Sequence, residues 1–327
     1  MEKKIEQPNI SPSRRSFLAG AGALGAAALV TGCSDKGPAT VTPPVTPPTT
    51  PAVTDADILN FALNLEYLEA EFYLRAATGS GLATADIGAN PGAVTGGAKV
   101  GGTLSATQLQ IINEIAYDEQ AHVRFLRKAI TAAGATPVSR PVIDFTASFP
   151  TLATAAGITG VTFNPFNDFD SFLVGAFVFE DVGVTAYHGA AGLISTAGIQ
   201  SGLLSAAAGI MAVEAYHAAY VRTALTGRAI LAASNSPATA YPYLTFANQI
   251  SALRSKLDGS SNETTLILPT TISTPSSIVA ADGNAIAYAR STDQVLHIVY
   301  GTGGGANVSK GGFFPSGLNG KITTTAS

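Results

Sequence analysis

The chain has 327 residues and a formal net charge of −4, and only 12% of its residues are charged. This mildly acidic balance argues against nucleic acid or an anionic lipid surface as the partner. The single cysteine, Cys33, excludes an intrachain disulfide, and the glycine run at 303–305 lacks the Lys-Ser/Thr ending that a phosphate-binding loop needs.

Residues 1–33 are predicted to be a targeting segment. Residues 13–18 (SRRSFL) form a twin-arginine pattern, and an apolar stretch from Ala19 to Val30 follows, too short to span a bilayer. The next residues end in Thr31-Gly32-Cys33, which resembles a lipoprotein cleavage site and predicts a lipidated Cys33. The alternative is a simple cleaved signal with an incidental cysteine. We expect export by the twin-arginine route to the periplasm or cell envelope, with a lipid anchor in the membrane.

Residues 34–54 are rich in proline and threonine and are predicted to form an extended linker without a core of its own. Removal of residues 1–32 leaves 14 basic and 20 acidic residues, a net charge of −6. The remainder is long enough to bury a substantial core. The linker would therefore tether a folded part that begins near residue 55.

Two long helices are predicted after the linker. The first begins near Asp55, because residues 54–57 have the form of a capping box, and ends at Gly79. The second begins after a capping box at 105–108 and ends at Gly134. The apolar residues that we expect to face inward are, in the first helix, Ile58, Phe61, Ala62, Leu65, Leu68 and Phe72 and, in the second, Ile111, Ile115, Phe125 and Leu126.

Two more helices follow a long connection between Gly134 and Asn167. The third is capped by Asp168 or Asp170 and runs to about Ile194, and the fourth runs from about Gly202 to Leu225 and ends at Gly227. Four long helices with one long crossover between the second and third are typical of ferritin-like folds. The sequence therefore predicts an all-α, ferritin-like four-helix bundle over residues 55–227.

Two Glu-x-x-His motifs suggest a metal site in this bundle. Glu119 and His122 form the first pair and Glu214 and His217 the second, and residues at i and i+3 lie on one face of a helix. The other two helices each carry a glutamate inside an apolar run, which is costly unless a cation or hydrogen bonds satisfy it. Such a set binds two iron or manganese ions in carboxylate bundles. The predicted ligands are Glu66, Glu119, His122, Glu180, Glu214 and His217.

The two helix pairs also resemble each other in sequence. Aligning Glu66 with Glu180 also aligns Tyr73 with Tyr187, as expected for a pseudo-twofold bundle. The same alignment places Gly183 opposite Glu69. It thus favours Glu66 as the ligand of the first helix and leaves Glu69 as a neighbouring charge or an additional ligand. We interpret both tyrosines as core residues or neighbours of the ligands rather than redox-active groups. His188 and His297 are interpreted as hydrogen-bonded core residues.

Residues 228–327 are predicted to form a mixed extension of helix and loop that packs on the bundle, although a partner-binding role is the alternative. One helix is expected from Leu244 to Leu257, and a shorter one is capped at Ser291 and runs through Tyr300. The glycine-rich end carries aromatic anchors at Phe313 and Phe314.

Residues 58–222 resemble the ferritin-like domain of bacterial exported proteins and plant desiccation-related proteins. The resemblance is strongest at 59–73 (LNFALNLEYLEAEFY), and 294–300 (QVLHIVY) and 311–315 (GGFFP) are similar to the family's C-terminal signature. The resemblance implies the fold but does not specify an activity.

The sequence leaves three functions open. The first is a di-iron or di-manganese oxidoreductase that acts on oxygen or peroxide in oxidative or desiccation stress. The second is a binding protein that sequesters metal. The third is a structural stress protein in which the carboxylates and imidazoles pair with each other without metal. A homo-oligomer is compatible with all three.

Overall fold

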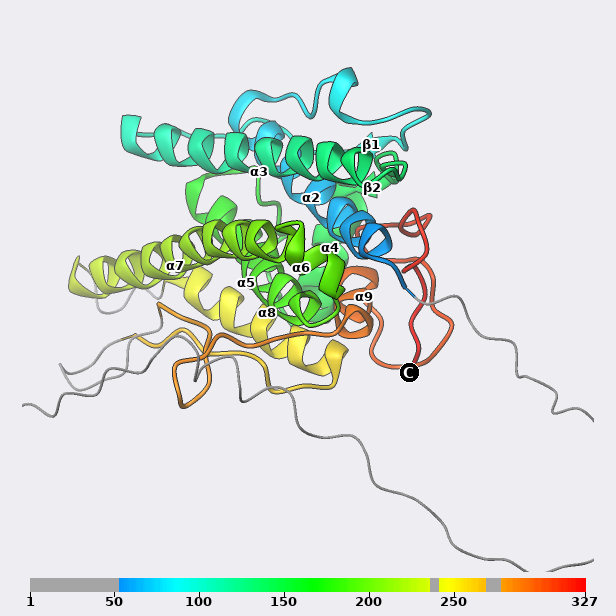
Figure 1. Ribbon diagram of the computed structural model, residues 1–327. Coiled ribbons are helices and arrows are strands. Elements are labelled where there is room, and N and C mark those ends of the chain that lie inside the picture. Colours follow the sequence, from blue (N-terminus) through cyan, green and yellow to red (C-terminus); the bar gives the residue numbers. More distant parts are fainter. Residues whose placement is uncertain (1–52, 236–240, 269–277) are drawn as a thin grey trace, which may run out of the picture. The chain divides into compact units, whose positions relative to one another are not determined.

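The computed structural model describes residues 53–235, 241–268 and 278–327, and four of its long helices form a bundle (Figure 1). The predicted signal and nearly all of the predicted linker, Cys33 included, lie outside the described residues. Eight α-helices and one two-stranded sheet make up the regular structure of the described part, which confirms the all-α fold class. Within that part, no helix is long and apolar enough to cross a membrane.

The first helix pair consists of α2 (Asp55–Thr78) and α3 (Ala106–Ala132). Both predicted capping boxes are present, and Gly79 ends α2 with a φ of 84°, a conformation that favours glycine. The helices run antiparallel, since Asn60 near the start of α2 donates a hydrogen bond to the carbonyl of Thr136, just after the end of α3. A short 3-10 helix, η1 (Thr84–Asp86), lies in the loop between them.

The prediction that Phe125 faces inward is wrong, because its side chain is 42% exposed. The buried residues of α3 include Ile115, Glu119, His122 and Leu126, which follow one another at steps of three and four. Phe125 is one residue before Leu126 and therefore about 100° away from it around the helix. It faces solvent because α3 packs chiefly on α2 and only lightly on the opposite pair.

The second helix pair consists of α5 (Phe169–Ala191) and α7 (Leu203–Asn235), with the short α6 (Thr196–Gln200) between them. Asp168 caps α5, whereas Asp170 pairs with Arg228 of α7. The predicted end of the fourth helix at Gly227 is wrong, since α7 continues to Asn235. The ion pair of Arg228 and the burial of Ala229 hold the additional turns on the bundle.

The crossover from α3 to α5 contains its own helix, α4 (Phe145–Ala155), which the sequence analysis did not predict. Asp144 caps it by accepting hydrogen bonds from two backbone N–H groups, and Phe145 and Phe149 anchor it in the core. Just before α4, β2 (Ile143–Asp144) pairs in parallel with β1 (Val94–Thr95) from the loop between α2 and α3. These short strands join the two long connections of the bundle.

The residues after α7 form α8 (Pro242–Asp258) and α9 (Thr292–Tyr300), and both pack against α5. The last residues return to α2, where the side chain of Asn64 exchanges two hydrogen bonds with the backbone of Asn319. Phe313 is buried against aromatic rings of α4 and α5. As a result, α2 and α5 are enclosed nearly all round, and polar residues in their middle lie far from solvent.

Candidate metal centre

The four long helices bring all six predicted ligand residues together in the middle of the bundle. Helix α2 supplies Glu66, α3 supplies Glu119 and His122, α5 supplies Glu180, and α7 supplies Glu214 and His217. All six are buried, and no glutamate of the set is more than 1% exposed. The i, i+3 spacing places His122 beside Glu119 of its own helix, whereas Glu214 groups with His122 of α3 rather than with His217 of its own helix.

His122 marks the first of two groups of potential ligand atoms. Its Nδ1 lies 3.1 Å from Glu119 Oε2, 3.3 Å from Glu66 Oε2 and 3.5 Å from Glu214 Oε1. These four residues can each place one ligand atom within 4.8 Å of all the others. The group therefore offers three carboxylate oxygens and one imidazole nitrogen to a single ion.

His217 marks the second group. Its Nδ1 lies 3.0 Å from Glu119 Oε1 and 3.5 Å from Glu180 Oε2, and these three residues meet the same 4.8 Å criterion. Glu119 belongs to both groups and directs a different oxygen to each. It is thus placed to bridge two ions.

The unsatisfied polar atoms of the centre fit the binding of a metal cation. Seven buried side-chain nitrogen or oxygen atoms of the described chain have no aligned hydrogen-bond partner. Six of them lie here: Oε2 of Glu66, Oε1 of Glu119, Oε2 of Glu180, both oxygens of Glu214, and Nδ1 of His217. Four buried carboxylates face only two imidazoles, and divalent cations would balance the excess negative charge. Oxygen and imidazole ligands suit iron or manganese.

Burial and mutual contact strongly shift the acidities of these groups. Burial raises the pKa of Glu66 to about 7 and raises that of Glu214 well above the usual range. Burial also acts to raise the pKa of Glu119, but the two histidines outweigh it and lower that pKa to about 2. Burial opposes charge on His217, yet Glu180 and Glu119 raise its pKa to about 12. A metal-free centre would therefore hold several protons, as the alternative of an all-protein network requires.

Two tyrosines, each on one helix pair, hydrogen-bond to a predicted ligand glutamate on the other pair. Tyr73 of α2 donates a hydrogen bond to Glu180 Oε1 of α5, and Tyr187 of α5 donates to Glu66 Oε1 of α2. Burial and then the neighbouring carboxylate raise the pKa of each phenol, so both remain protonated donors. Each tyrosine thus orients the glutamate of the opposite helix pair.

Glu69 is buried beside the centre but belongs to neither group of ligand atoms. It approaches Glu214 in a space that Gly183 leaves open. An ideal Cβ at Gly183 would lie 2.3 Å from Glu214 Oε2 and 3.5 Å from Glu69 Oε1. Burial and then the charge of Glu214 raise the pKa of Glu69 well above its usual value, so that Glu69 is a carboxylic acid in the metal-free centre.

The sequence analysis missed Asp118, which contacts the outer side of a predicted ligand, His217. Its Oδ2 lies 3.2 Å from Nε2 of His217, the ring nitrogen opposite the one that faces the carboxylates. A carboxylate at this position fixes the tautomer and orientation of a ligand histidine. Asp118 directly precedes the first Glu-x-x-His motif. The residue that directly precedes the second motif is Val213, which has no carboxylate, so His122 receives no equivalent contact from it. The signal was the place of Asp118 one residue before Glu119.

The two remaining histidines lie away from the centre. His188 Nδ1 is 3.1 Å from the carbonyl of Tyr288, and His297 lies between the carbonyls of Thr302 and Ser327 at 3.0 and 2.9 Å. Both are engaged in backbone hydrogen bonds, as the sequence analysis expected.

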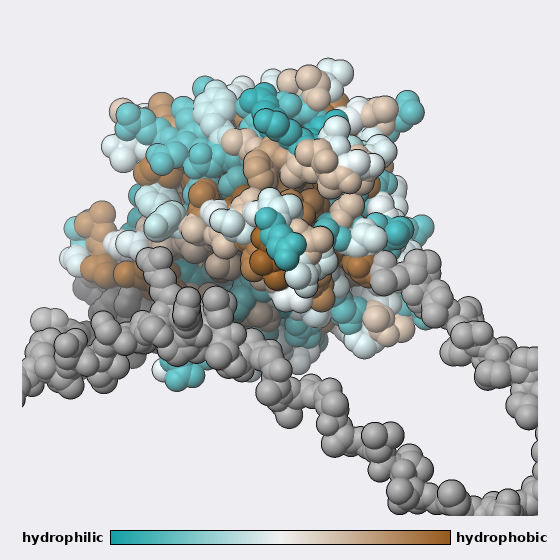
Figure 2. Space-filling model, viewed as in Figure 1, coloured by the Kyte–Doolittle hydropathy of each residue, from teal (hydrophilic) through white to brown (hydrophobic). Residues whose placement is uncertain are grey.

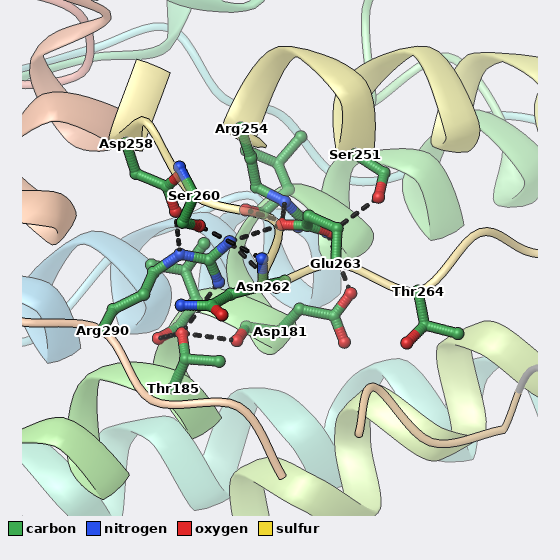
Figure 3. A network of polar contacts seen from close by, with 12 residues as sticks. Asp181, Thr185, Ser251, Arg254, Asp258, Ser260, Asn262, Glu263, Thr264 and Arg290 are labelled. Atoms are coloured by element: carbon green, nitrogen blue, oxygen red, sulfur yellow. Dashed lines mark hydrogen bonds and ion pairs between the residues drawn. The ribbon is translucent and has the colours of Figure 1, made fainter. Parts of the chain in front are cut away.

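A second polar cluster lies against α5 and includes Asp181, the residue after Glu180 (Figure 3). We call it the arginine network, and it consists of Asp181, Arg222, Arg254, Asp258, Glu263 and Arg290. Asp181, next to Glu180 in sequence, accepts hydrogen bonds of 2.8 Å from Arg222 and 2.9 Å from Arg254. Arg254 also donates to the carbonyl of Phe177 and pairs with Glu263.

At its other end, the arginine network connects two segments of the C-terminal extension with each other. Arg290 pairs with Asp258 at 2.6 Å and with Glu263 at 2.7 Å, and it donates to Thr185 of α5. Three acidic and three basic groups make the network neutral. It fastens the end of α8 and the segment before α9 to the part of α5 that carries Glu180.

A helical bundle with one long crossover and a central cluster of glutamates and Glu-x-x-His pairs defines the ferritin-like class of proteins. Residues 54–227 match the model of the ferritin-like domain family, and the chain belongs to this family. The resemblance drawn from the sequence is thereby confirmed.

Two relatives extend the similarity beyond the bundle. The chain is 32% identical over 283 residues to the ferritin-like catalase Nec2 of Nesocodon mauritianus, with 82% of this chain and 84% of that protein covered. It is 31% identical over 255 residues to the desiccation-related protein PCC13-62 of Craterostigma plantagineum, with 74% and 76% covered. Both alignments are longer than the matched family segment, so the likeness includes residues outside it.

Proposed function

We propose that this protein is an exported ferritin-like enzyme that disproportionates hydrogen peroxide at a dinuclear iron or manganese centre. The observation that carries the proposal is the set of six unsatisfied polar atoms on four glutamates and a histidine in the middle of the bundle. A relative named as a ferritin-like catalase supports peroxide as the substrate. The relative named for desiccation supports a role in stress but implies no particular reaction.

The reaction converts two molecules of hydrogen peroxide to two of water and one of oxygen. One peroxide gains two electrons and two protons, and the other loses the same number, so no external reductant is needed. A bound pair of iron or manganese ions would supply the two-electron exchange. The chain would hold the pair through Glu66, Glu119, His122 and Glu214 on one side and Glu119, Glu180 and His217 on the other.

The residues around the ligands would orient the centre and hold protons. The phenols of Tyr73 and Tyr187 donate to Oε1 of Glu180 and of Glu66, respectively, so that Oε2 of each glutamate would remain to hold a metal ion. The carboxyl group of Glu69, beside Glu214, would hold a proton within the otherwise apolar interior.

The proposed location is the cell envelope. The twin-arginine pattern at 13–18 supports export in a folded state, and Cys33 would carry the lipid anchor. Residues 34–54 would then hold the enzyme away from the membrane surface. There it would meet peroxide that enters the envelope from outside. Mass spectrometry of the protein recovered from the envelope tests this part, since a lipid-modified Cys33 at the N-terminus is the expected result.

Metal analysis and peroxide turnover test the proposed activity. Protein purified after export is expected to contain about two equivalents of iron or manganese and to release oxygen from peroxide. The double variant His122→Ala/His217→Ala should lose both metal and turnover, and Glu214→Ala should lose turnover. His188→Ala is the matched control, because that histidine binds a backbone carbonyl outside the centre.

The same experiment separates the alternatives. Metal without turnover would favour sequestration, and wild-type protein without metal, whose melting is unchanged by chelator, would favour the structural role. Either result would overturn the catalase proposal.

A further inference from the structure

An apolar pocket between α2, α5 and the start of α7 reaches the candidate metal centre. Ala190, Ala191 and Ala207 are among its half-buried residues and mark the outer end, and the buried Glu66 and Glu69 mark the inner end. We call it the Ala186 pocket after the residue whose small side chain leaves it open. The space-filling view shows apolar surface in the middle of the face that carries α6 and the start of α7 (Figure 2).

The internal repeat shows how this side of the bundle differs from the equivalent side. The alignment that sets Glu66 against Glu180 also sets Phe72 against Ala186. The ring of Phe72 lies 4.9 Å from that of Tyr73 and 5.8 Å from that of Phe172, measured between centroids, and closes the Glu180 side. At the equivalent place beside Tyr187, Ala186 has only a methyl group as its side chain.

The glycines support the same asymmetry. A Cβ at Gly175 would lie 2.9 Å from Cζ of Phe72, so the absence of a side chain at Gly175 makes room for that ring. The counterpart of Gly175 in the first pair is Phe61, which lines the Ala186 pocket instead. Tyr73 is consequently fully buried, whereas Tyr187 is only partly buried. The side of the centre that carries Tyr187 and Glu66 is thus less closely packed than the side that carries Tyr73 and Glu180.

A second apolar pocket lies under α8 and α9 and also reaches Glu69 and Gly183. It is lined by no member of the six-residue ligand set, whereas the Ala186 pocket is lined by Glu66. Of these two pockets, the Ala186 pocket is therefore the one that reaches a predicted ligand.

We propose that the Ala186 pocket is the route by which a small uncharged oxidant, such as hydrogen peroxide or dioxygen, reaches the metal ions. This inference rests on the proposed function and specifies its substrate class. Apolar walls make the passage costly for an ion. Anionic oxidants and anionic chelators are excluded for the same reason.

Filling the pocket tests the route. Ala190→Phe places a ring at the outer end, and Ala207→Phe does so from a different helix in case the first variant folds poorly. Ala206→Phe is the matched control, because Ala206 is also half-buried on α7 but does not line the pocket. Each metal-loaded protein is assayed for metal content, for kcat/KM with hydrogen peroxide and, after reconstitution with ferrous iron, for the rate of nitric oxide binding.

The expected result is a fall of about tenfold or more in both kcat/KM and the nitric oxide rate for the two pocket variants, with metal content and the control unchanged. Nitric oxide binding does not depend on turnover. If the wild type failed to consume peroxide but the pocket variants still slowed nitric oxide, the proposed catalase activity would be wrong and the route correct. Unchanged nitric oxide rates in folded, metal-loaded pocket variants would overturn the route. Rapid binding of azide, an anionic probe, to the wild type would overturn the exclusion of anions.

Discussion

The phenol of Tyr73, on α2, donates a hydrogen bond to Oε1 of Glu180, on α5. The bond ties a predicted ligand of one helix pair to the other pair. In Tyr73→Phe, Glu180 would keep its place but lose the donor that orients it. We expect metal affinity to fall by roughly 10- to 100-fold, measured by competition with a chelator.

Tyr67→Phe is the matched control for this change. Tyr67 is equally buried in α2, but its hydroxyl contacts Arg127 and the carbonyl of Val138 instead of the centre. This variant should lose some stability and keep its metal affinity. Equal affinity losses in both variants would mean that general destabilisation, not the orientation of Glu180, is responsible.

Gly183 leaves the space into which the carboxylate of Glu214 projects. In Gly183→Ala the new methyl group would lie 2.3 Å from Glu214 Oε2, so that the carboxylate must move. We expect the variant to bind at least one equivalent of metal less than the wild type, as measured by elemental analysis. Gly227→Ala is the control, because a Cβ there meets no atom within 4 Å and alanine stabilises a helix by roughly 1 kcal/mol. Full metal content in Gly183→Ala would contradict this role.

Metal binding should release protons. In the metal-free protein, burial raises the pKa of Glu66 to about 7 and raises those of Glu69 and Glu214 further. Carboxylates and imidazoles bind metal when deprotonated, so the affinity should rise as the pH increases through 7 and fall in acid. A pH indicator in weak buffer would report the released protons, and His122→Ala/His217→Ala should release none. A constant affinity between about pH 6 and pH 8 would contradict the prediction.

The arginine network should be important for stability. Arg254→Met leaves Asp181 and Glu263 without one of their buried partners, and breaking such a pair from one side costs roughly 3–5 kcal/mol. Denaturant unfolding would measure this loss as a fall in the free energy of unfolding. Lys321→Met is the control: Lys321 also pairs with an aspartate, but its side chain is 60% exposed and the expected loss is about 0–1 kcal/mol. Similar losses in the two variants would be evidence against a special role of the network.

The six-residue cluster could be predicted from the sequence because it depends on short spacings within single helices. A glutamate and a histidine three residues apart must share a helix face, and the internal repeat then selected Glu66 over Glu69. The structure places Glu66 in the first group of ligand atoms and Glu69 outside both groups. The repeat also predicted that Tyr73 and Tyr187 would lie in related positions, but not that each would bond to the other pair's glutamate.

The contacts that escaped prediction depend on packing between distant segments. Asp118 contacts His217 at a separation of 99 residues, and Asp181 meets Arg254 at a separation of 73. No helical period specifies such pairs. The end of α7 and the presence of α4 were missed for a related reason, since Gly227 and Pro150 both lie inside helices that tertiary contacts hold together.

The arginine network also has a consequence for how the protein is made. Asp181 is a buried charge on α5, and its second arginine is synthesised 73 residues later. At roughly 5–20 residues per second, α5 waits several seconds on the ribosome before that partner exists. In a chain that terminates before Arg254, Asp181 would have Arg222 as its arginine partner but would lack the second one. The complete neutral network against the helix that carries Glu180 can therefore form only after Arg254 and Arg290 have been synthesised.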